Sequence, residues 1–257
     1  MAVIANTAAR LYGLFAGHLP FHREPLRSFY NVAYLTYKRF EDPFANLAAA
    51  RPDLFEGGHI VDAGANVGYT TLLFARHVSE PFQVHAFEPD PGSLSLLARN
   101  AAKSPYRSRI RIHSAAVGSR NRRAKLAINR SHPADHRIIT PSFVRDEVIE
   151  VDVVAIDDAV DGPVAFVKMD VQGYELEASR GMQMTMERNS RIAVALEYAP
   201  RAMTDLGFDP WALLMFYRDR GFHFQRIDRR NLIALEPMEI ARRIRGDNFV
   251  NLLCTRR

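Results

Sequence analysis

Short apolar runs alternate with amphipathic stretches from about residue 59 onward, and this alternation is typical of βαβ units built around a parallel sheet. The runs predict strands at His59–Asp62, Gln83–Phe87, Ile110–His113, Val164–Asp170 and Ile192–Glu197. Helices are expected to begin near Gly68, Pro91, Gly173 and Pro210. Three further apolar runs, at 222–227, 232–235 and 249–255, have no long helix between the first two, so we expect a mixed α/β sheet.

The pattern changes near residue 55 and divides the chain into two predicted parts. Residues 1–54 carry aromatic and aliphatic side chains at helical spacing, which predicts an N-terminal helical extension. Residues 55–257 contain the βαβ pattern. Within them, residues 117–162 form an insertion whose alternating runs at 123–128 and 148–156 predict an antiparallel hairpin.

Composition restricts the possible classes of protein. A chain of 257 residues with 47% hydrophobic residues can bury one sizeable core. Its single cysteine, Cys254, excludes an internal disulfide and favours a cytoplasmic location. The net charge of +5 attracts anions, but no basic motif is interleaved with aromatic residues, so no nucleic-acid partner is expected. The first 25 residues predict neither a signal peptide nor a membrane span, because polar residues interrupt every apolar run.

Polar residues follow four of the predicted parallel strands. These residues are Asp62, Glu88, Ser114 and Asp170. Ligands of open parallel sheets bind outside the carboxyl ends of the strands, so these positions form a set of candidate ligand contacts.

The stretch VDAGANVG, residues 61–68, resembles a nucleotide-binding turn but departs from the dinucleotide fingerprint. That fingerprint places a second glycine where this chain has Asn66, between Gly64 and Gly68. An asparagine side chain would crowd a pyrophosphate. S-adenosylmethionine has no phosphate, and its carboxylate, ammonium and ribose diol suit a helix N-terminus, Asp62 and Glu88. NAD enzymes also place an acid after the second strand, so Glu88 alone does not discriminate.

Five segments in order resemble the motifs of the FkbM-type S-adenosylmethionine-dependent methyltransferases. They are VDAGANVGYTT, AFEPDPGSLSLLARN, AAVG, VDVVAIDD and VKMDVQGYELEASRG. The resemblance extends from about Glu41 to Gly181. It implies a Rossmann-like class I methyltransferase fold with a mostly parallel seven-stranded sheet whose last strand is antiparallel, and an O-methyltransferase acting on small molecules or sugars.

The resemblance also implies roles for individual residues. The methionine part of the cofactor would contact Asp62, Gly64, Asn66 and Gly68. Glu88 would bind the ribose, Ser114 and Ala115 the adenine, and Asp170 would lie beside the transferred methyl group. Family members often have glutamate where this chain has Gln172, so a role that needs a charge there is in doubt. Glu41 matches an acidic residue that suggests a lid formed by the N-terminal helices.

Two residues are candidates for the base that removes the proton of the acceptor hydroxyl. His136 lies in the insertion above the strand ends, and histidine titrates near neutral pH. Asp170 ends an apolar strand, and Lys168 lies on the same side of that strand, where it could pair with a carboxylate. A divalent cation at Asp170, with oxygens from Glu175, Glu197 or Asp135, is possible chemistry but is not expected. Glu197 is a candidate for the acceptor pocket.

Several functions remain open at this point. A nicotinamide-dependent oxidoreductase, a methyltransferase acting on a nucleic acid or another polyanion, and a non-catalytic relative are the alternatives to a small-molecule or glycan O-methyltransferase. The aromatic N-terminal helices could cover the site, form a homo-oligomer or rest on a membrane surface. The sequence does not identify the acceptor.

Overall fold

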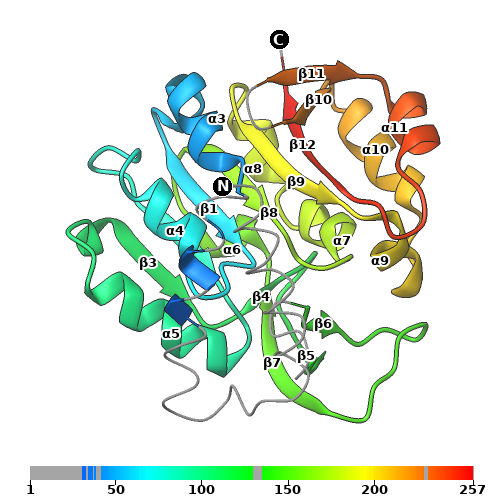
Figure 1. The fold of residues 1–257 in the computed structure, drawn as a ribbon, viewed down its shortest axis with the longest axis horizontal. Coiled ribbons are helices and arrows are strands. Elements are labelled where there is room, and N and C mark those ends of the chain that lie inside the picture. Colours follow the sequence, from blue (N-terminus) through cyan, green and yellow to red (C-terminus); the bar gives the residue numbers. More distant parts are fainter. Residues whose placement is uncertain are drawn as a thin grey trace.

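The main body is an eight-stranded sheet with strand order β11-β10-β12-β9-β8-β1-β2-β3 (Figure 1). The structure is a computed structural model, and it describes residues 31–32, 34–36, 38, 42–129, 135–228 and 231–256. The strands are β1 (His59–Ala63), β2 (Val84–Phe87), β3 (Ile110–His113), β8 (Val164–Met169), β9 (Ala193–Tyr198), β10 (His223–Ile227), β11 (Leu232–Leu235) and β12 (Val250–Thr255).

Strands β3, β2, β1, β8 and β9 are parallel, as the alternating pattern predicts. Strand β12 lies between β9 and β10 and is antiparallel to both, which confirms the expected direction of the last strand. The expected number of seven strands was wrong by one. Strand β11 pairs with β10 through a short connection and adds an antiparallel edge strand.

Helices cover both faces of this sheet. In β1, Ile60 packs with Phe55 and Phe74 on one face, whereas Val61 belongs to the larger hydrophobic cluster on the other. The first face is covered by α3 (Phe44–Ala50), the 3-10 turn η1 (Pro52–Phe55), α4 (Tyr69–Phe74) and α5 (Pro91–Ala102). The second is covered by α6 (Ile156–Ala159), α7 (Glu175–Arg180), α8 (Gln183–Arg188), α10 (Pro210–Arg218) and α11 (Pro237–Arg243). Burial on both faces explains why the central strands are almost entirely apolar.

The sequence marks the beginning of two of these helices. Asp90 precedes α5 and its side chain accepts a hydrogen bond from the Ser93 N–H, while Asp209 caps α10 in the same way. Each cap is followed by a proline at the first helical position, where its missing N–H costs nothing.

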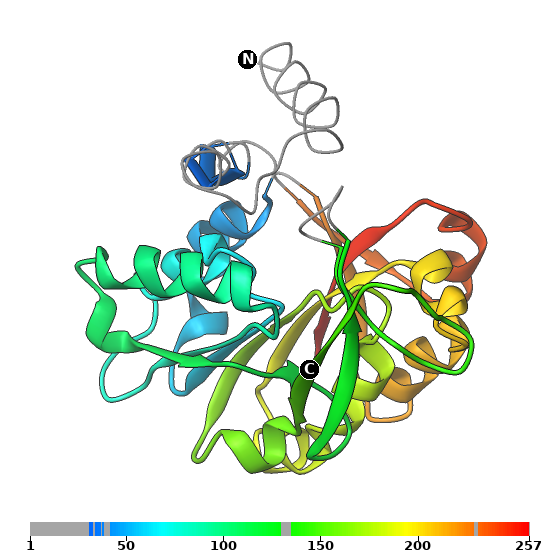
Figure 2. The same cartoon turned by 90° about the horizontal axis from the view of Figure 1, so that it is seen from below.

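The insertion forms a second sheet with strand order β4-β7-β5-β6. It contains β4 (Ala116–Val117), β5 (Arg122–Ala127), β6 (Arg137–Ile138) and β7 (Val148–Val154). The antiparallel pairing of β5 with β7 confirms the predicted hairpin. Figure 2 shows these green strands next to the yellow part of the chain. Between these two parts, Arg137 Nη1 lies 3.5 Å from Asp205 Oδ2 of α9 (Pro200–Asp205). The Thr140 hydroxyl donates to the Leu206 carbonyl.

The boundary predicted at residue 54 falls within packed structure. Phe44 and Leu47 of α3 and Phe55 of η1 are buried in the cluster that also contains Ile60 of β1. Residues 1–30 and Glu41 lie outside the described residues, so the helical lid and the role of Glu41 stay predictions. In the described part of the chain, no helix combines the length and the apolar character needed to cross a bilayer.

Candidate active site

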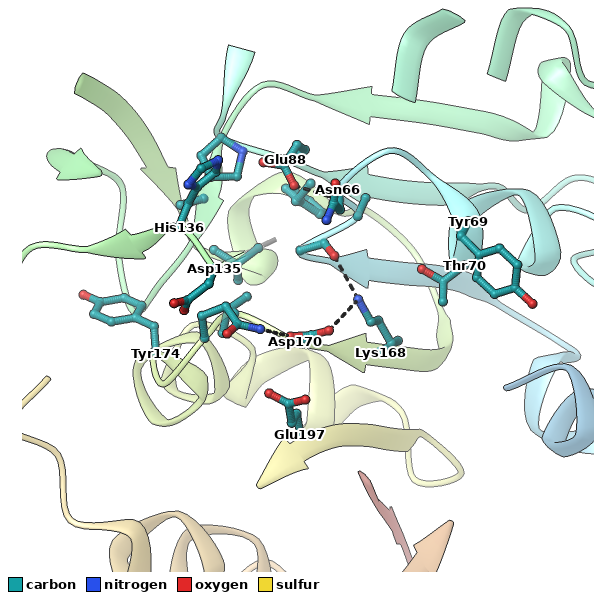
Figure 3. A pocket seen from close by; sticks show the side chains of 18 of the residues that line it. Asn66, Tyr69, Thr70, Glu88, Asp135, His136, Lys168, Asp170, Tyr174 and Glu197 are labelled. Carbon is teal, nitrogen blue, oxygen red and sulfur yellow. Dashed lines mark hydrogen bonds and ion pairs between the residues drawn. The ribbon is translucent and has the colours of Figure 1, made fainter. Parts of the chain in front are cut away.

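A cavity of about 560 Å³ opens at the carboxyl ends of β1, β2, β8 and β9 (Figure 3). Its volume falls in the range of small-molecule sites. Five of the nine residues predicted for the site line it, namely Gly64, Asn66, Glu88, His136 and Asp170. The fold thus brings together residues separated by about a hundred positions in the chain, because the parallel strands end at one edge of the sheet.

The turn after β1 has a backbone that few residues tolerate. Gly64 adopts φ +75°, and a Cβ there would lie 1.9 Å from the Asp170 carbonyl oxygen, so only glycine fits between the ends of β1 and β8. Asn66 also has positive φ, at 49°, which is accessible to asparagine more readily than to most residues. The Asn66 side chain reaches the Tyr34 hydroxyl at 3.4 Å.

The N–H groups of this turn donate within the protein. Those of Gly64 and Ala65 donate to the Phe87 carbonyl, and that of Gly68 donates to the Ala65 carbonyl. The Asn66 N–H donates to Glu88 Oε2 at 2.8 Å. A pyrophosphate needs free N–H donors here, and it would also face the carboxylate of Glu88.

Glu88 ends β2 and is almost completely buried, yet it lines the cavity. Its Oε1 accepts from the Asp90 N–H at 2.9 Å, and its Oε2 accepts from Asn66. Burial raises the pKa of Glu88 to about 7, although these two hydrogen bonds favour the charged form. A carboxylate oxygen has two acceptor sites, so each oxygen can accept one more hydrogen bond from a ligand.

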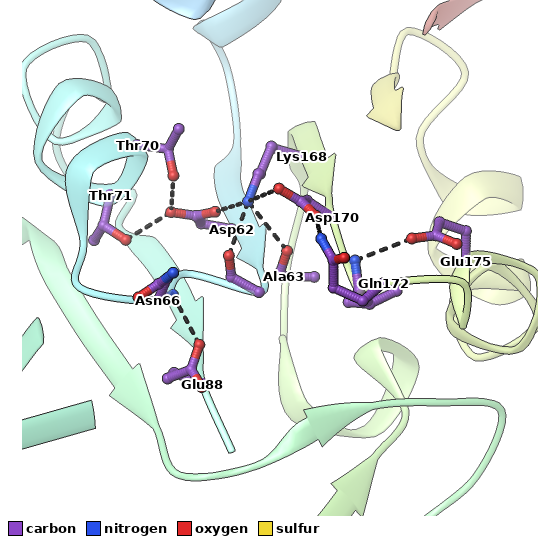
Figure 4. A network of polar contacts seen from close by, with 12 residues as sticks. Asp62, Ala63, Asn66, Thr70, Thr71, Glu88, Lys168, Asp170, Gln172 and Glu175 are labelled. Carbon is purple, nitrogen blue, oxygen red and sulfur yellow. Dashed lines mark hydrogen bonds and ion pairs between the residues drawn. The ribbon is translucent and has the colours of Figure 1, made fainter. Parts of the chain in front are cut away.

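Lys168 is the centre of a buried polar network between β1 and β8 (Figure 4). Its Nζ donates to the Gly64 carbonyl at 2.9 Å and lies 3.3 Å from Asp62 Oδ1 and 3.8 Å from Asp170 Oδ2. Burial disfavours the charged amine, but the carboxylates of Asp62 and Asp170 outweigh this effect and hold the pKa of Lys168 above its ordinary value. The predicted pairing of Lys168 with a carboxylate is confirmed.

The segment after β8 positions Asp170 at the cavity. Gln172 has φ +54°, and its Nε2 donates to Asp170 Oδ1 at 2.7 Å. A glutamate at this position would place a second carboxylate against Asp170 instead of a donor. Glu175 accepts from the N–H groups of Val171 and Gly173, and burial raises its pKa to about 7.

His136 approaches the cavity from the insertion. Its Nδ1 accepts a hydrogen bond from the Asn129 N–H at 3.0 Å, and its Nε2 lies 3.8 Å from Asp90 Oδ2. An accepting Nδ1 fixes the neutral ring with its proton on Nε2. Burial lowers the pKa of His136, although nearby carboxylates act in the opposite direction. The ring therefore presents a donor, and not a basic nitrogen, toward Asp90.

The chain matches the model of the methyltransferase FkbM domain over residues 62–224, which is more than half of its length. The chain belongs to the FkbM methyltransferase family. This confirms the resemblance seen in the sequence motifs, and the observed sheet order is the Rossmann-like arrangement that the resemblance implied.

Solved structures similar to this FkbM-family chain share little of its sequence. The methyltransferase FkbM from Methylobacillus flagellatus KT has 19% identity and a TM-score of 0.49, with 98% of this chain and 59% of that chain covered. This chain therefore spans less than two thirds of that protein. An O-methyltransferase from Bacillus cereus in complex with SAH has 11% identity and a TM-score of 0.48, with 98% and 90% covered. No curated protein sequence matches the chain.

Four residues predicted to contact the cofactor do not line the cavity of this FkbM-family chain. Ser114 is exposed and Ala115 is buried, and neither lines the cavity; the next two residues, Ala116 and Val117, do so. Gly68 turns the chain into α4 with φ +92° and makes room for Leu97, since a Cβ would lie 2.6 Å from that side chain. Contact of these three residues with the cofactor stays a prediction.

Asp62 is the fourth residue, and it is fully buried behind Lys168. Its Oδ2 accepts from the hydroxyls of Thr70 and Thr71 at 2.7 and 2.6 Å. The Lys168 ammonium already lies next to Asp62, and contact of Asp62 with the cofactor stays a prediction. The cofactor-binding and catalytic roles of the cavity-lining residues stay predictions.

Several cavity residues of this FkbM-family chain were missed by the sequence interpretation. Asp42, whose pKa burial raises to about 6, lies directly before α3, and Tyr34 and Lys38 line the cavity from the segment before it. Phe249 and Asn251 line it from the far end of the chain. They were missed because no motif surrounds them. Among the described residues, no three histidine, cysteine or acidic side chains are arranged to hold a metal ion.

Proposed function

We propose that this chain transfers a methyl group from S-adenosylmethionine to a hydroxyl group of a small molecule or a sugar. Membership of the FkbM methyltransferase family supports the reaction class. The observation that carries the choice of donor is the contact between the Asn66 N–H and Glu88 at the cavity wall. It leaves a carboxylate acceptor where a ribose diol can bind, and it occupies the Asn66 N–H, which a pyrophosphate could otherwise use.

Different residues of the cavity would bind different parts of the donor and the acceptor. Glu88 would bind the ribose hydroxyls through the free acceptor sites of its two oxygens. Gly64 and Asn66 would contact the methionine end, and Asp170 would lie beside the reacting groups. Bound S-adenosylmethionine supplies an electrophilic methyl group on a positively charged sulfur. The chain aligns the acceptor with that methyl group and excludes water, and such positioning lowers barriers by roughly 7–11 kcal/mol in well-aligned systems.

A nicotinamide-dependent oxidoreductase is the alternative that the turn argues against. Dinucleotide enzymes bind the pyrophosphate through N–H groups after the first strand. Here those of Gly64, Ala65, Asn66 and Gly68 already donate to acceptors of the protein.

Ligand-dependent unfolding separates these functions. S-adenosylhomocysteine at about 100 times its Kd stabilises the folded state by about 2.7 kcal/mol, which for a chain of this size corresponds to a rise in Tm of about 5–10 °C. We expect this rise with S-adenosylhomocysteine and no rise with NADH. A rise with NADH alone would reject the proposal.

An assay that measures consumption of S-adenosylmethionine can identify the methyl acceptor. The panel contains sugars, small alcohols and, for the polyanion alternative, RNA and DNA, each with and without a chelator. We expect turnover with a hydroxyl-bearing small molecule or sugar, and no effect of the chelator.

The single buried thiol, Cys254, supports a reducing, cytoplasmic location.

A further inference from the structure

Asp170 and Glu197 are neighbours at the edge of the sheet. The last register pair of β8 and β9 is Met169 with Leu196, so Asp170 and Glu197 occupy the next position of two strands that lie about 4.8 Å apart. On the other side, Asn251 of β12 is paired with Glu197. All three line the cavity, and Figure 3 shows the Glu197 carboxyl group directed toward Asp170.

The two carboxyl groups differ in their partners. Asp170 accepts from Gln172 and lies 3.8 Å from the Lys168 ammonium. Glu197 makes no hydrogen bond or ion pair with any residue that the structure describes. Glu197 is half-buried and lines the cavity, so the acceptor sites of its carboxyl group remain open to a ligand there.

The charges around Glu197 determine when it holds a proton. Two acids face it, Asp170 from the end of β8 and Glu175 from α7, and two cations, Lys168 from β8 and Lys38, act against them. Burial and the two acids prevail and raise the pKa of Glu197 well above its ordinary value. Without a ligand, Glu197 thus retains its proton to a higher pH than a free glutamate.

A positive charge brought into this cavity changes that balance. The sulfonium of S-adenosylmethionine is such a charge, and an opposite charge nearby favours the ionised carboxylate. S-adenosylhomocysteine has the same carboxylate, ammonium and ribose but a neutral sulfur. The two ligands therefore differ in the one charge to which Glu197 responds.

We propose that Glu197 is the proton acceptor of methyl transfer, and that it loses its own proton when the positively charged donor binds. This inference rests on the proposed function. In the transfer, the acceptor oxygen forms a bond to the methyl carbon, the C–S bond breaks with its electron pair remaining on sulfur, and the hydroxyl proton moves to the Glu197 carboxylate. The positive charge on sulfur and the negative charge on Glu197 disappear together, so the net charge of the cavity does not change during the transfer.

The two bases suggested by the sequence are less suited to this step. His136 accepts at Nδ1 from the Asn129 N–H and carries its proton on Nε2. Asp170 lies next to the Lys168 ammonium and accepts a hydrogen bond from the Gln172 amide. Both groups can orient a substrate, whereas Glu197 has no partner among the described residues and keeps all of its acceptor sites.

Proton release on ligand binding tests this inference without an acceptor. Isothermal titration at pH 7 in two buffers of different ionisation enthalpy gives the number of protons exchanged. We expect S-adenosylmethionine to release more protons than S-adenosylhomocysteine from the wild-type protein. In Glu197→Gln this difference should vanish while the Kd for S-adenosylhomocysteine changes less than about threefold, because an amide resembles the neutral acid. Glu187→Gln, an exposed substitution on α8, should behave as wild type.

Each result decides the inference. Equal proton release by the two ligands from the wild-type protein overturns it, and this comparison needs no variant. A difference that persists in Glu197→Gln also overturns it, because the responding group then lies elsewhere, for example on the ligand's own amino group. Glu197→Asp, which keeps a titrating group, should restore part of the difference. If neither ligand binds, the proposed function fails together with the inference, whereas equal release with normal binding removes the inference alone.

Discussion

The backbone N–H of Asn66 donates a hydrogen bond of 2.8 Å to Glu88 Oε2, and this contact joins the turn after β1 to the end of β2. The contact has two consequences for the cavity. It fixes the Glu88 carboxyl group at the wall, and it removes the N–H that a phosphate would use. A glycine at position 66 could make the same hydrogen bond, so the side chain of Asn66 serves another purpose, its contact with Tyr34.

Replacing Glu88 by glutamine should weaken ligand binding, because the charge is lost and the amide NH2 must face one of the two backbone N–H groups that donate to the carboxylate. Loss of charge-assisted hydrogen bonds costs about 1.5–3 kcal/mol, which corresponds to a roughly 10- to 150-fold higher Kd for S-adenosylhomocysteine. Isothermal titration measures this value. Glu150→Gln on the exposed face of β7 is the matched control and should bind normally. An unchanged Kd in Glu88→Gln would remove Glu88 from the site.

The same carboxyl group gives ligand binding a pH dependence. Burial places the pKa of Glu88 at about 7, and the ionised form is the better acceptor for a diol. Affinity for S-adenosylhomocysteine should therefore increase as the pH rises through 7 and decrease as it falls below. In Glu88→Gln, the Kd for S-adenosylhomocysteine, measured by isothermal titration between pH 6 and 8, should depend less on pH.

Lys168→Met should destabilise the fold, because it leaves the buried carboxylate of Asp62 without its cation. Removing one member of a buried ion pair costs about 3–5 kcal/mol. Replacing both members costs less, so the double variant Asp62→Asn with Lys168→Met should recover most of this loss. Urea unfolding of the two variants measures the free energies. A double variant as unstable as Lys168→Met alone would show that Lys168 stabilises the fold through other contacts.

Acid should destabilise the protein through a row of histidines on β1, β2 and β3. His85 stacks on His113 and meets the His59 ring edge-on, and burial lowers the pKa of His85 to about 3. In the unfolded chain histidine titrates near pH 6.5, so the unfolded state binds more protons below that pH. Stability is fully present above about pH 6.5. It should decrease by about 1.4 kcal/mol per pH unit below it for this one group.

Two variants test whether His85 causes this loss of stability at low pH. In His85→Phe the slope of the unfolding free energy between pH 5 and 6.5 should become smaller, because one proton-binding difference is removed. His223→Phe, at an exposed position of β10, should keep the wild-type slope. Urea unfolding at a series of pH values provides both slopes. Equal slopes in all three proteins would place the acid sensitivity in other groups.

His136 should be the neutral tautomer with its proton on Nε2. The Asn129 N–H donates to its Nδ1, and burial lowers its pKa below the ordinary value. Nitrogen-15 chemical shifts of the ring should show an unprotonated Nδ1 at and above pH 6.5. A proton on Nδ1 would contradict the hydrogen bond from Asn129 and would restore Nε2 as a candidate base.

The sequence predicted the elements of this fold closely because each carries its own local signal. The apolar runs that gave β1, β2 and β8 are buried on both faces of the sheet and so contain few polar residues. The hairpin of the insertion alternates polar and apolar residues, since it has one exposed face. The apolar run at 232–235 likewise predicted the edge strand β11, which the seven-stranded family pattern did not include.

The chain itself determined which residues reach the carboxyl edge of the sheet, since Gly64, Glu88 and Asp170 follow strands whose order is encoded in the alternating pattern. Only the tertiary structure decided their partners. Lys168 forms an ion pair with Asp62, whereas Glu197, near the end of β9, has no partner among the described residues. The reason is physical: hydrophobic periodicity is a local property, but the partner and the proton affinity of a carboxyl group depend on charges and burial contributed by strands far apart in the sequence.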